Sequence, residues 1–245
     1  MYGSVAISPE SGIKTLEYGK IETIWNRDEK TFKVKPGEPR WREFEALRFW
    51  HVTEKIDGTN IRVSLGPGQF PDNWRAEEGA LVKAPSRVTF GGRTDAAQIQ
   101  ASVVQMLQGL FPAEKVAGAF DVDTTAILFG EAYGPKIQKG GGLYRADVGF
   151  RLFDVVVFGA DGRPWWLTWE NVENVAKKLG IKTVPVLNPR ATLEEAVAHV
   201  YAKSATAAED GGPGLDQEGI VARSEPPLFT RAGRRLCWKL KVKDF

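Results

Sequence analysis

The feature that most constrains the fold is a set of short segments in which apolar residues recur with the two-residue period of a β-strand. Each segment is rich in β-branched and aromatic residues and is bounded by turn-forming residues. These segments are Val52–Leu65, Ala126–Gly130, Phe150–Phe158, Gly219–Arg223 and Leu236–Val242. The sequence therefore predicts a fold in which short strands provide most of the framework.

Three further segments have the helical period. One follows Thr168 and ends at Gly180, and a second begins at Thr192, which forms a capping box with Glu195. The third, over Ile99–Leu110, has its apolar residues on one face. Strands with a few interspersed helices are typical of the α+β class and not of a doubly wound sheet.

Turn residues gather in Gly66–Gly79 and in Glu209–Asp216, and both segments are predicted to be loops. Neither has the composition of a domain linker, and no repeat or low-complexity tract divides the chain. A chain of 245 residues can bury a sizeable core. We therefore expect residues 1–245 to form one domain.

Composition excludes several classes of protein. Cys237 is the single cysteine, so neither an internal disulfide nor a cysteine-based zinc cluster is expected, and His51 and His199 are too far apart to form a local metal motif. We expect each histidine to lie at the surface or to cap a helix.

No segment reaches the roughly 20 apolar residues of a membrane helix, and Met1–Ser11 lacks the apolar centre of a signal peptide. These features predict a cytoplasmic protein with no membrane contact.

The first segment that points to chemistry is Glu54–Asn60, which lies between two strand-like runs. On a strand, Lys55 and Asp57 share a face, and Gly58 permits a turn or the close approach of a ligand. A lysine beside a carboxylate could also be a solvated ion pair. Other segments of the sequence are needed to distinguish a ligand-binding site from a solvated ion pair.

The second segment is Leu236–Val242, where strand alternation places Lys239 and Lys241 on one face with Cys237. These lysines could simply protect an edge strand. Alternatively, two ammonium groups could line a site for a polyanion. They would then lower the pKa of a neighbouring nucleophilic lysine, because like charges disfavour its protonated form.

The third group consists of acids beside apolar strands, namely Glu131, Asp154 and Glu218. A carboxylate at such a position needs a cation, a metal or hydrogen-bond donors to offset its loss of hydration. Each could belong to a structural ion pair. Together with the two lysine segments, the three acids favour a site for a ribose and a divalent metal.

In these segments the sequence resembles the covalent nucleotidyltransferase superfamily of RNA ligases, DNA ligases and mRNA capping enzymes. The segments that resemble its motifs I, III, IIIa, IV and V are, in that order, Lys55–Gly58, Phe129–Gly134, Phe150–Val155, Glu218–Val221 and Lys239–Lys241. Five motifs in the family's order are far more specific than any one of them. The resemblance implies a ligase-type nucleotidyltransferase domain of antiparallel sheets flanked by helices.

The resemblance also implies catalytic roles. Lys55 would attack ATP and carry covalent AMP, while Lys239 and Lys241 would hold the α-phosphate. Arg93 resembles the arginine placed near the 5′-phosphate or the pyrophosphate, and Arg62 is a rival for that role. Magnesium or manganese is implied as the metal, since both suit oxygen ligands and phosphates.

The remaining roles implied by the resemblance concern the nucleotide and the metal. The residues expected around the nucleotide are Glu54 near the adenine amino group, Asp57 and Asn60 around the lysine and ribose, Glu131 at the ribose hydroxyl, and Phe153 stacked on adenine. Asp154 and Glu218 are expected to serve the metal and the lysine.

Within the superfamily, Tyr18–Ile24 and Asp57–Asn60 most resemble phage-type RNA ligases that seal nicks. We therefore expect an ATP-dependent RNA ligase of RNA repair that joins 3′-hydroxyl and 5′-phosphate ends in a nicked duplex containing RNA. Asp57 is also typical of DNA ligases, so an ATP-dependent DNA ligase stays open, as do a GTP-using capping enzyme and an inert nucleic-acid-binding module. Because the chain ends four residues after Lys241, we expect no C-terminal OB-fold or helical domain, and a separate protein or domain could help to bind the ends.

Overall fold

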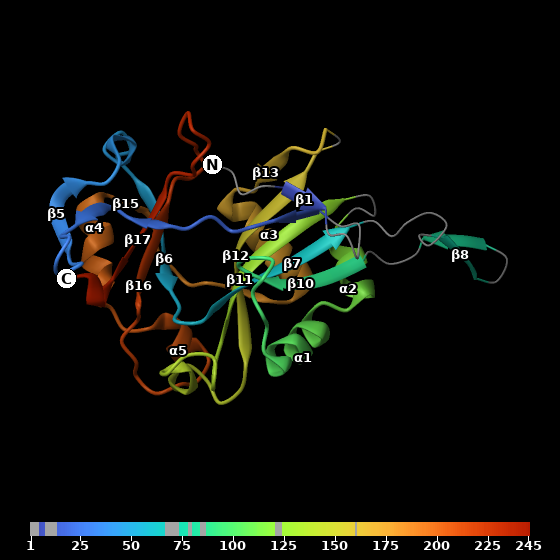
Figure 1. Cartoon of the computed structure of the whole chain (residues 1–245). Helices are drawn as coiled ribbons and strands as arrows, with labels where there is room; N and C mark the ends of the chain where they lie inside the picture. The colour runs from blue at the N-terminus through green and yellow to red at the C-terminus, as the bar shows by residue number, and fades with distance from the viewer. Residues whose placement is uncertain are drawn as a thin grey trace.

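The computed structural model describes residues 5–7, 14–66, 74–77, 80–83, 87–120, 124–159 and 161–245. Within these residues, two large sheets lie side by side, and a few helices cover them (Figure 1). The α+β class predicted from the sequence is confirmed.

The larger sheet has six strands, in the order β10–β7–β11–β12–β13, with β14 paired to β12. Their bounds are Thr59–Gly66 for β7, Arg87–Gly92 for β10, Thr125–Tyr133 for β11, Gly149–Phe158 for β12, Pro164–Trp166 for β13 and Lys182–Thr183 for β14. All pairs are antiparallel except β12 with β14.

The smaller sheet has five strands, in the order β15–β6–β16–β17–β3. Their bounds are Glu22–Thr23 for β3, Trp50–Lys55 for β6, Val186–Ala191 for β15, Gly219–Arg223 for β16 and Cys237–Lys241 for β17. Only β17 and β3 pair in parallel. Consecutive strands β6 and β7 belong to different sheets, so the chain crosses between the sheets directly after Lys55.

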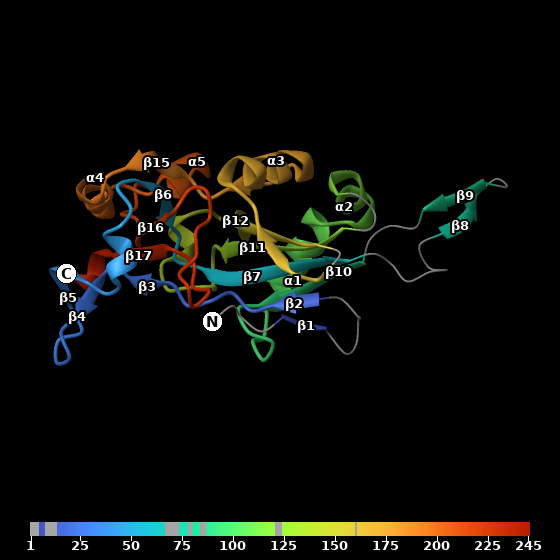
Figure 2. The same cartoon turned by 90° about the horizontal axis from the view of Figure 1, so that it is seen from above.

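The other strands form three two-stranded ribbons: β1 (Val5–Ile7) with β2 (Lys14–Leu16), β4 (Trp25–Arg27) with β5 (Val34–Pro39), and β8 (Trp74–Glu77) with β9 (Ala80–Lys83). The helices are α1 (Ala101–Leu110), α2 (Ala113–Ala119), α3 (Trp169–Leu179), α4 (Leu193–Ala198) and α5 (Ala205–Glu209). Figure 2 shows α2 to α5 along one side of the molecule, with β1, β2 and β3 on the other. Within the part of the chain described here, no helix has the length and apolar character needed to cross a membrane.

The main core lies between the six-stranded sheet and helices α1, α2 and α3. Strand alternation explains how β11 serves two cores, because Leu128 faces this main cluster while Ile127 and Phe129 face a smaller cluster on the opposite side. A third cluster covers the five-stranded sheet and α4. With both faces covered, the six-stranded sheet is a rigid support for side chains at its ends.

Gly130 adjusts β11 just before its last residues reach the site. The register of β11 against β12 shifts between Phe129 and Gly130. A Cβ at Gly130 would lie 2.1 Å from the Phe150 ring and 2.6 Å from the Arg151 carbonyl, so only glycine fits there. The irregularity therefore fixes the direction in which Glu131 projects.

The sequence patterns located the main elements correctly. Helix α3 lies between Thr168 and Gly180, whose φ of 56° suits glycine, and α4 has the predicted capping box. Helix α1 begins only at Ala101, after an irregular segment, and the short helices α2 and α5 were not predicted. The predicted loop Gly66–Gly79 contains strand β8, while its residues 67–73 and 78–79 lie outside the described part of the chain.

The expectation of a surface or capping position is wrong for His51. Its side chain is buried, with 4% of the residue exposed, and its ring lies 4.8 Å from that of Trp169. Burial, together with the positive charge of the adjacent Arg223, lowers the pKa of His51 to about 4. The folded protein therefore holds this histidine neutral over most of the acidic range.

This burial predicts a pH dependence of stability. Below its ordinary pKa of 6.5 the His51 side chain takes up a proton in the unfolded chain, whereas in the folded chain it does so only below about 4. The free energy of unfolding should therefore fall as the pH drops from 6.5 to 4, by up to about 3 kcal/mol from this group. Urea denaturation across this range should show a shallower fall for His51→Gln. His199→Gln is the control, and an unchanged slope in His51→Gln would contradict the assignment.

Candidate active site

Lys55 occupies the point where the chain leaves one sheet for the other. It is the last residue of β6, and residues 56–58 lead directly into β7. Ile56 is buried in the main core, and a Cβ at Gly58 would lie 2.3 Å from the carbonyl oxygen of Ala132 on β11. The crossing is therefore packed tightly against β11, which holds Lys55 at the junction of the two sheets.

Glu218 links Lys55 to Lys241. Gly219 pairs with Lys55 on one side and with Lys241 on the other, so the preceding glutamate lies at the end of three adjacent strands. One oxygen of Glu218 lies 2.6 Å from Nζ of Lys55, and Nζ of Lys241 donates a hydrogen bond to the other. One carboxylate therefore holds two of the predicted catalytic lysines.

A cavity of about 180 Å³ opens beside Lys55, with walls from both sheets. Side chains lining it include Asn60 of β7, Glu131 of β11, Phe153 of β12, Arg223 of β16 and Lys239 of β17. Residues 18–21 form a further wall. The structure therefore brings together at one pocket residues whose separation in the sequence reaches 221 positions, that between Tyr18 and Lys239.

Charges in the pocket do not act on Lys55 as the sequence analysis predicted. Burial lowers the pKa of Lys55, but the carboxylates of Glu131, Glu218 and Asp57 outweigh that effect and raise it. The prediction that neighbouring lysines lower this pKa is therefore wrong for the protein without nucleotide. The pKa of Lys239 is lowered instead. Burial and the positive charges of Lys241 and Lys55 bring it to about 8.

Glu131 carries the complementary perturbation. Burial raises its pKa to about 7, and the negative charges of Glu218 and Asp57 add to this effect, while Lys55 opposes it. Its register partner Asn60 has a buried Oδ1 with no hydrogen-bond partner. The pocket thus contains oxygen atoms that are poorly satisfied by the protein itself and could accept from a ligand or bind a cation.

Asp154 does not offer the free carboxylate that a metal ligand requires. It is 1% exposed, and both its oxygens are engaged by Arg235, at 2.7 and 3.0 Å. Arg223 lies 3.3 Å from one oxygen, and the Tyr18 hydroxyl donates to the other at 2.5 Å. The structural ion pair left open by the sequence is the interpretation that these contacts support.

The carboxylate of Glu54 is likewise committed to the fold. It accepts hydrogen bonds from the hydroxyls of Ser204 and Thr206 and from the Thr206 backbone N–H, at 2.5 to 2.9 Å. Strand alternation places it on the face of β6 opposite Lys55. Glu54 is therefore among the residues that line the cavity, but its carboxylate is engaged by α5 and the residue before it.

The two candidate arginines differ in their surroundings. Arg62 is buried and donates to the Gly92 carbonyl at 2.8 Å and to Asp95 at 2.6 Å, and it does not line the pocket. Arg93 is exposed and lines the pocket edge. Of the two, Arg93 is the one placed to meet a ligand, whereas Arg62 ties β7 to the segment after β10.

Sequence reasoning did not identify Arg223 or Lys20 as parts of the pocket wall, and it treated Tyr18 only as part of a family resemblance. Arg223 could have been suspected from a charge inside the apolar strand Gly219–Arg223. Lys20 and Tyr18 lie in an irregular segment that gives no periodic signal. Their contribution depends on tertiary packing.

The family model described as RNA ligase matches residues 48–241. The chain therefore belongs to the RNA ligase family. No curated protein sequence matches the chain.

Among solved structures, the chain is similar to a Naegleria gruberi RNA ligase, with 19% identity and a TM-score of 0.53 over 93% of this chain and 63% of that one. It is also similar to an archaeal ATP-dependent RNA ligase, with 16% identity and a TM-score of 0.55 over 97% of this chain and 51% of that one. A putative ATP-dependent DNA ligase from Aquifex aeolicus has 18% identity and a TM-score of 0.52 over 93% of this chain and 50% of that one. These similarities show the ligase-type fold, and the chain spans less than two thirds of the length of these proteins.

The Asp154 contacts generate a stability prediction. Asp154→Asn would leave Arg223 and Arg235 without their shared negative charge in a buried environment, so the free energy of unfolding should fall by about 3 to 5 kcal/mol. Urea denaturation measures this change. The matched control is Asp161→Asn, which removes an exposed pair with Arg163 and should cost less than about 1 kcal/mol. Equal, small losses in both variants would show that the buried cluster is not what stabilises this region.

Proposed function

We propose that this chain is an ATP-dependent RNA ligase that forms a covalent lysyl-AMP at Lys55. The observation that carries the proposal is the position of Lys55, held 2.6 Å from Glu218 in a pocket between two sheets and faced by Lys239. Membership of the RNA ligase family supports it. So do the Naegleria RNA ligase structures, which are described with ATP and manganese or with AMP and manganese.

In the first step, the neutral amine of Lys55 attacks the α-phosphorus of ATP. A nitrogen–phosphorus bond forms as the bond from that phosphorus to the oxygen bridging toward the β-phosphate breaks, and pyrophosphate leaves with the electron pair. Nζ must lose its extra proton before it attacks. Glu218, in contact with it, positions the amine, but the charges of Lys55 and Lys241 outweigh burial and lower the pKa of Glu218, so this carboxylate is a weak acceptor for that proton. Lys239 and Lys241 then face the negative charge that develops on the phosphate.

The raised pKa of Lys55 defines what else the step requires. Positive charge brought near Glu131, Asp57 and Glu218 offsets the carboxylates that keep the lysine protonated. Among the described residues, no three acidic, histidine or cysteine side chains converge as a ready-made metal site. Magnesium and manganese do not require one, because one or two carboxylates can hold such an ion together with substrate phosphates.

The oxygens in the pocket wall that could hold a divalent ion are those of Glu131 and Oδ1 of Asn60. Both oxygens of Glu218 are held by Lys55 and Lys241, so Glu218 would serve an ion only by releasing one of these lysines. A bound ion would supply charge neutralisation at the phosphates. Asp154 is not proposed as a ligand, because its oxygens are occupied by arginines. Phe153 provides a ring in the pocket wall against which the adenine can stack, and Arg93 lies where phosphates would enter.

After AMP transfer, a 5′-phosphate end would accept AMP from Lys55, and a 3′-hydroxyl would then displace AMP to form the phosphodiester. We propose nicked duplexes containing RNA as the substrate. The net charge of the chain is only +2, which favours few phosphate contacts and modest affinity. A nick already holds the two ends together and so supplies proximity that weak binding cannot.

Formation of the adduct tests the assignment of Lys55. Incubation with labelled ATP and magnesium should label the protein, labelled GTP should not, and Lys55→Ala should abolish labelling because the attacking amine is gone. Denaturing gel electrophoresis with detection of the label measures this, and circular dichroism checks that the variant is folded.

Lys203→Ala is the matched control, because Lys203 is exposed and pairs only with Asp216 across its loop. This variant should be labelled like the parent protein. Labelling of folded Lys55→Ala would exclude Lys55 as the nucleophile, and labelling by GTP alone would indicate a capping guanylyltransferase.

A comparison of substrates tests the preference for nicks. The parent protein should seal a nicked duplex faster than it joins the same two strands without a template, by at least tenfold, because the duplex supplies the proximity. Sealing should decrease as salt rises, whereas lysyl-AMP formation should change less, since only sealing depends on phosphate contacts.

Rates of product formation on both substrates across a salt series measure this preference. Equal or faster joining of the untemplated strands would contradict it. Lysyl-AMP formation without sealing of either substrate would point to a separate domain or protein that clamps the ends.

A further inference from the structure

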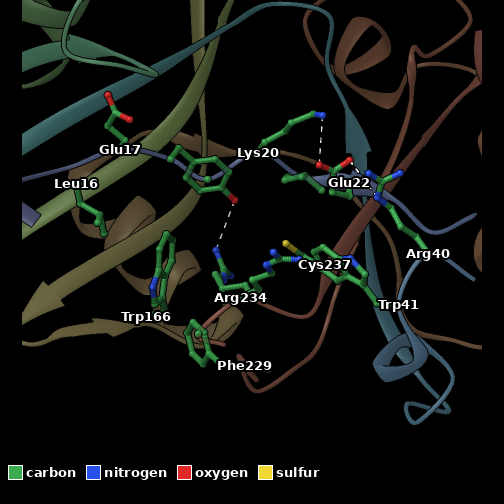
Figure 3. Close-up of a pocket in the computed structure, with 15 residues that line it drawn as sticks. Leu16, Glu17, Lys20, Glu22, Arg40, Trp41, Trp166, Phe229, Arg234 and Cys237 are labelled. Atoms are coloured by element: carbon green, nitrogen blue, oxygen red, sulfur yellow. Dashed lines mark hydrogen bonds and ion pairs between the residues drawn. The ribbon is translucent and has the colours of Figure 1, made fainter. Parts of the chain in front are cut away.

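A second cavity lies on the other side of the segment that walls the lysine pocket. Its volume is about 400 Å³, and residues 18–21 line both cavities. Figure 3 shows its side chains, which come from this segment, from Arg40 and Trp41, from Trp166 on β13, and from the connection between β16 and β17. The catalytic steps proposed above make no use of it.

Two guanidinium groups in this cavity lie over indole rings, within the range of a cation–π interaction. The guanidinium of Arg234 lies 5.3 Å from the Trp41 ring, and that of Arg235 lies 4.0 Å from the Trp166 ring. Trp41 also stacks on Phe44, with the ring centroids 4.9 Å apart. The packed indole rings therefore attract the two guanidinium groups and hold them near the cavity wall.

The two arginines differ in what remains available to a ligand. Arg235 is part-buried and engaged by Asp154, which accepts from it at 2.7 and 3.0 Å. Arg234 is exposed, and within the described part of the chain its side chain forms no ion pair or hydrogen bond. Because Arg234 lines the cavity and Trp41 is its only ring contact among the described residues, the side of its guanidinium away from Trp41 and its N–H groups are free for a ligand.

Positive charge is in excess at this end of the cavity. Lys20 and Arg40 share one carboxylate, that of Glu22, at 3.2 and 3.5 Å. The other acid in the lining, Glu17, lies at the opposite end from Arg40 (Figure 3). Lys20, Arg40 and Arg234 are thus three cations for one carboxylate, which suits a ligand that brings phosphate.

The cavity is also in line with the reacting lysines. Cys237, Lys239 and Lys241 share a face of β17, and they lie respectively at this cavity, at the lysine pocket and at Glu218. Each step of two residues spans about 7 Å, which is on the scale of one nucleotide in an extended strand. Gly19, on the dividing segment, is exposed, and a Cβ there would meet no atom within 4 Å, so no side chain of this residue stands between a ligand and the segment.

We propose that this cavity binds a nucleotide of the polynucleotide end that is being joined. The base stacks on the free face of Arg234, as bases do on guanidinium planes, and Lys20 and Arg40 contact the flanking phosphates. This inference rests on the proposed function, because it assigns the strand path to the same active site. It adds a strand-binding site that the five sequence motifs do not include.

Fluorescence anisotropy with a labelled, 5′-phosphorylated single-stranded RNA tests the proposal. Arg234→Ala should weaken binding roughly tenfold, the loss expected for one stacked base. Arg234→Lys should also weaken binding but keep the salt dependence, because it keeps the charge and loses the plane. Arg40→Ala should lower the slope of log K against log salt by about 0.7, one phosphate contact of a single strand. Arg231→Ala, an exposed arginine of the same connection that does not line the cavity, is the matched control.

The outcomes are separable. Unchanged affinity and salt dependence in both Arg234→Ala and Arg40→Ala would overturn the site, as would equal competition by polyglutamate, which would make it a general anion site. A DNA strand of the same sequence shows whether the site selects ribose. Formation of lysyl-AMP together with unchanged binding in the variants would defeat this inference alone. Binding that depends on Arg234 in a protein that forms no lysyl-AMP would defeat the proposed function alone.

Discussion

The crossing of the chain from β6 to β7 is the constraint on which the site depends. Three residues separate the two sheets, and Gly58 packs so closely on β11 that any side chain would collide with the Ala132 carbonyl. Lys55 therefore cannot move independently of either sheet. The six-stranded sheet brings Asn60, Glu131 and Phe153 to it, and the five-stranded sheet brings Glu218, Lys239 and Lys241. A binding pocket arises because one short connection holds two separately packed cores together.

Charge balance in the pocket explains why its residues differ in protonation. Three carboxylates surround Lys55 and raise its pKa, and the same crowding, with burial, raises the pKa of Glu131 to about 7. Partial burial and two neighbouring lysines lower the pKa of Lys239 to about 8. The pocket without nucleotide thus keeps its nucleophile protonated. A bound phosphate with its cation changes the electrostatic potential that sets these pKa values. Lys55 therefore becomes a nucleophile only when the substrate binds.

Sequence patterns predicted the elements with strong local signals and failed where tertiary contacts decide. Strand β16 and helix α3 have clear periodicity and turn or cap residues, and both were placed correctly. The same patterns gathered Lys55, Glu131, Glu218 and Lys239 into one candidate site, and the structure places them together. They could not reveal that Asp154 and Glu54 are already engaged, because their partners Arg235 and Thr206 lie 81 and 152 positions away. Nor could they give the direction of the Lys55 pKa, which depends on distances between strands.

The segment of residues 18–21 has a thermodynamic consequence for the two cavities that it separates. It is anchored where the Tyr18 hydroxyl donates to Asp154, and no other backbone lies between the cavities in their shared lining. A ligand in one cavity that favours a particular position of this wall must therefore alter the affinity of the other cavity. Such coupling is reciprocal: whatever factor one ligand applies to the second, the second applies to the first. The hydrogen bond between Tyr18 and Asp154 would then influence the strength of the coupling between ligand binding at the two cavities.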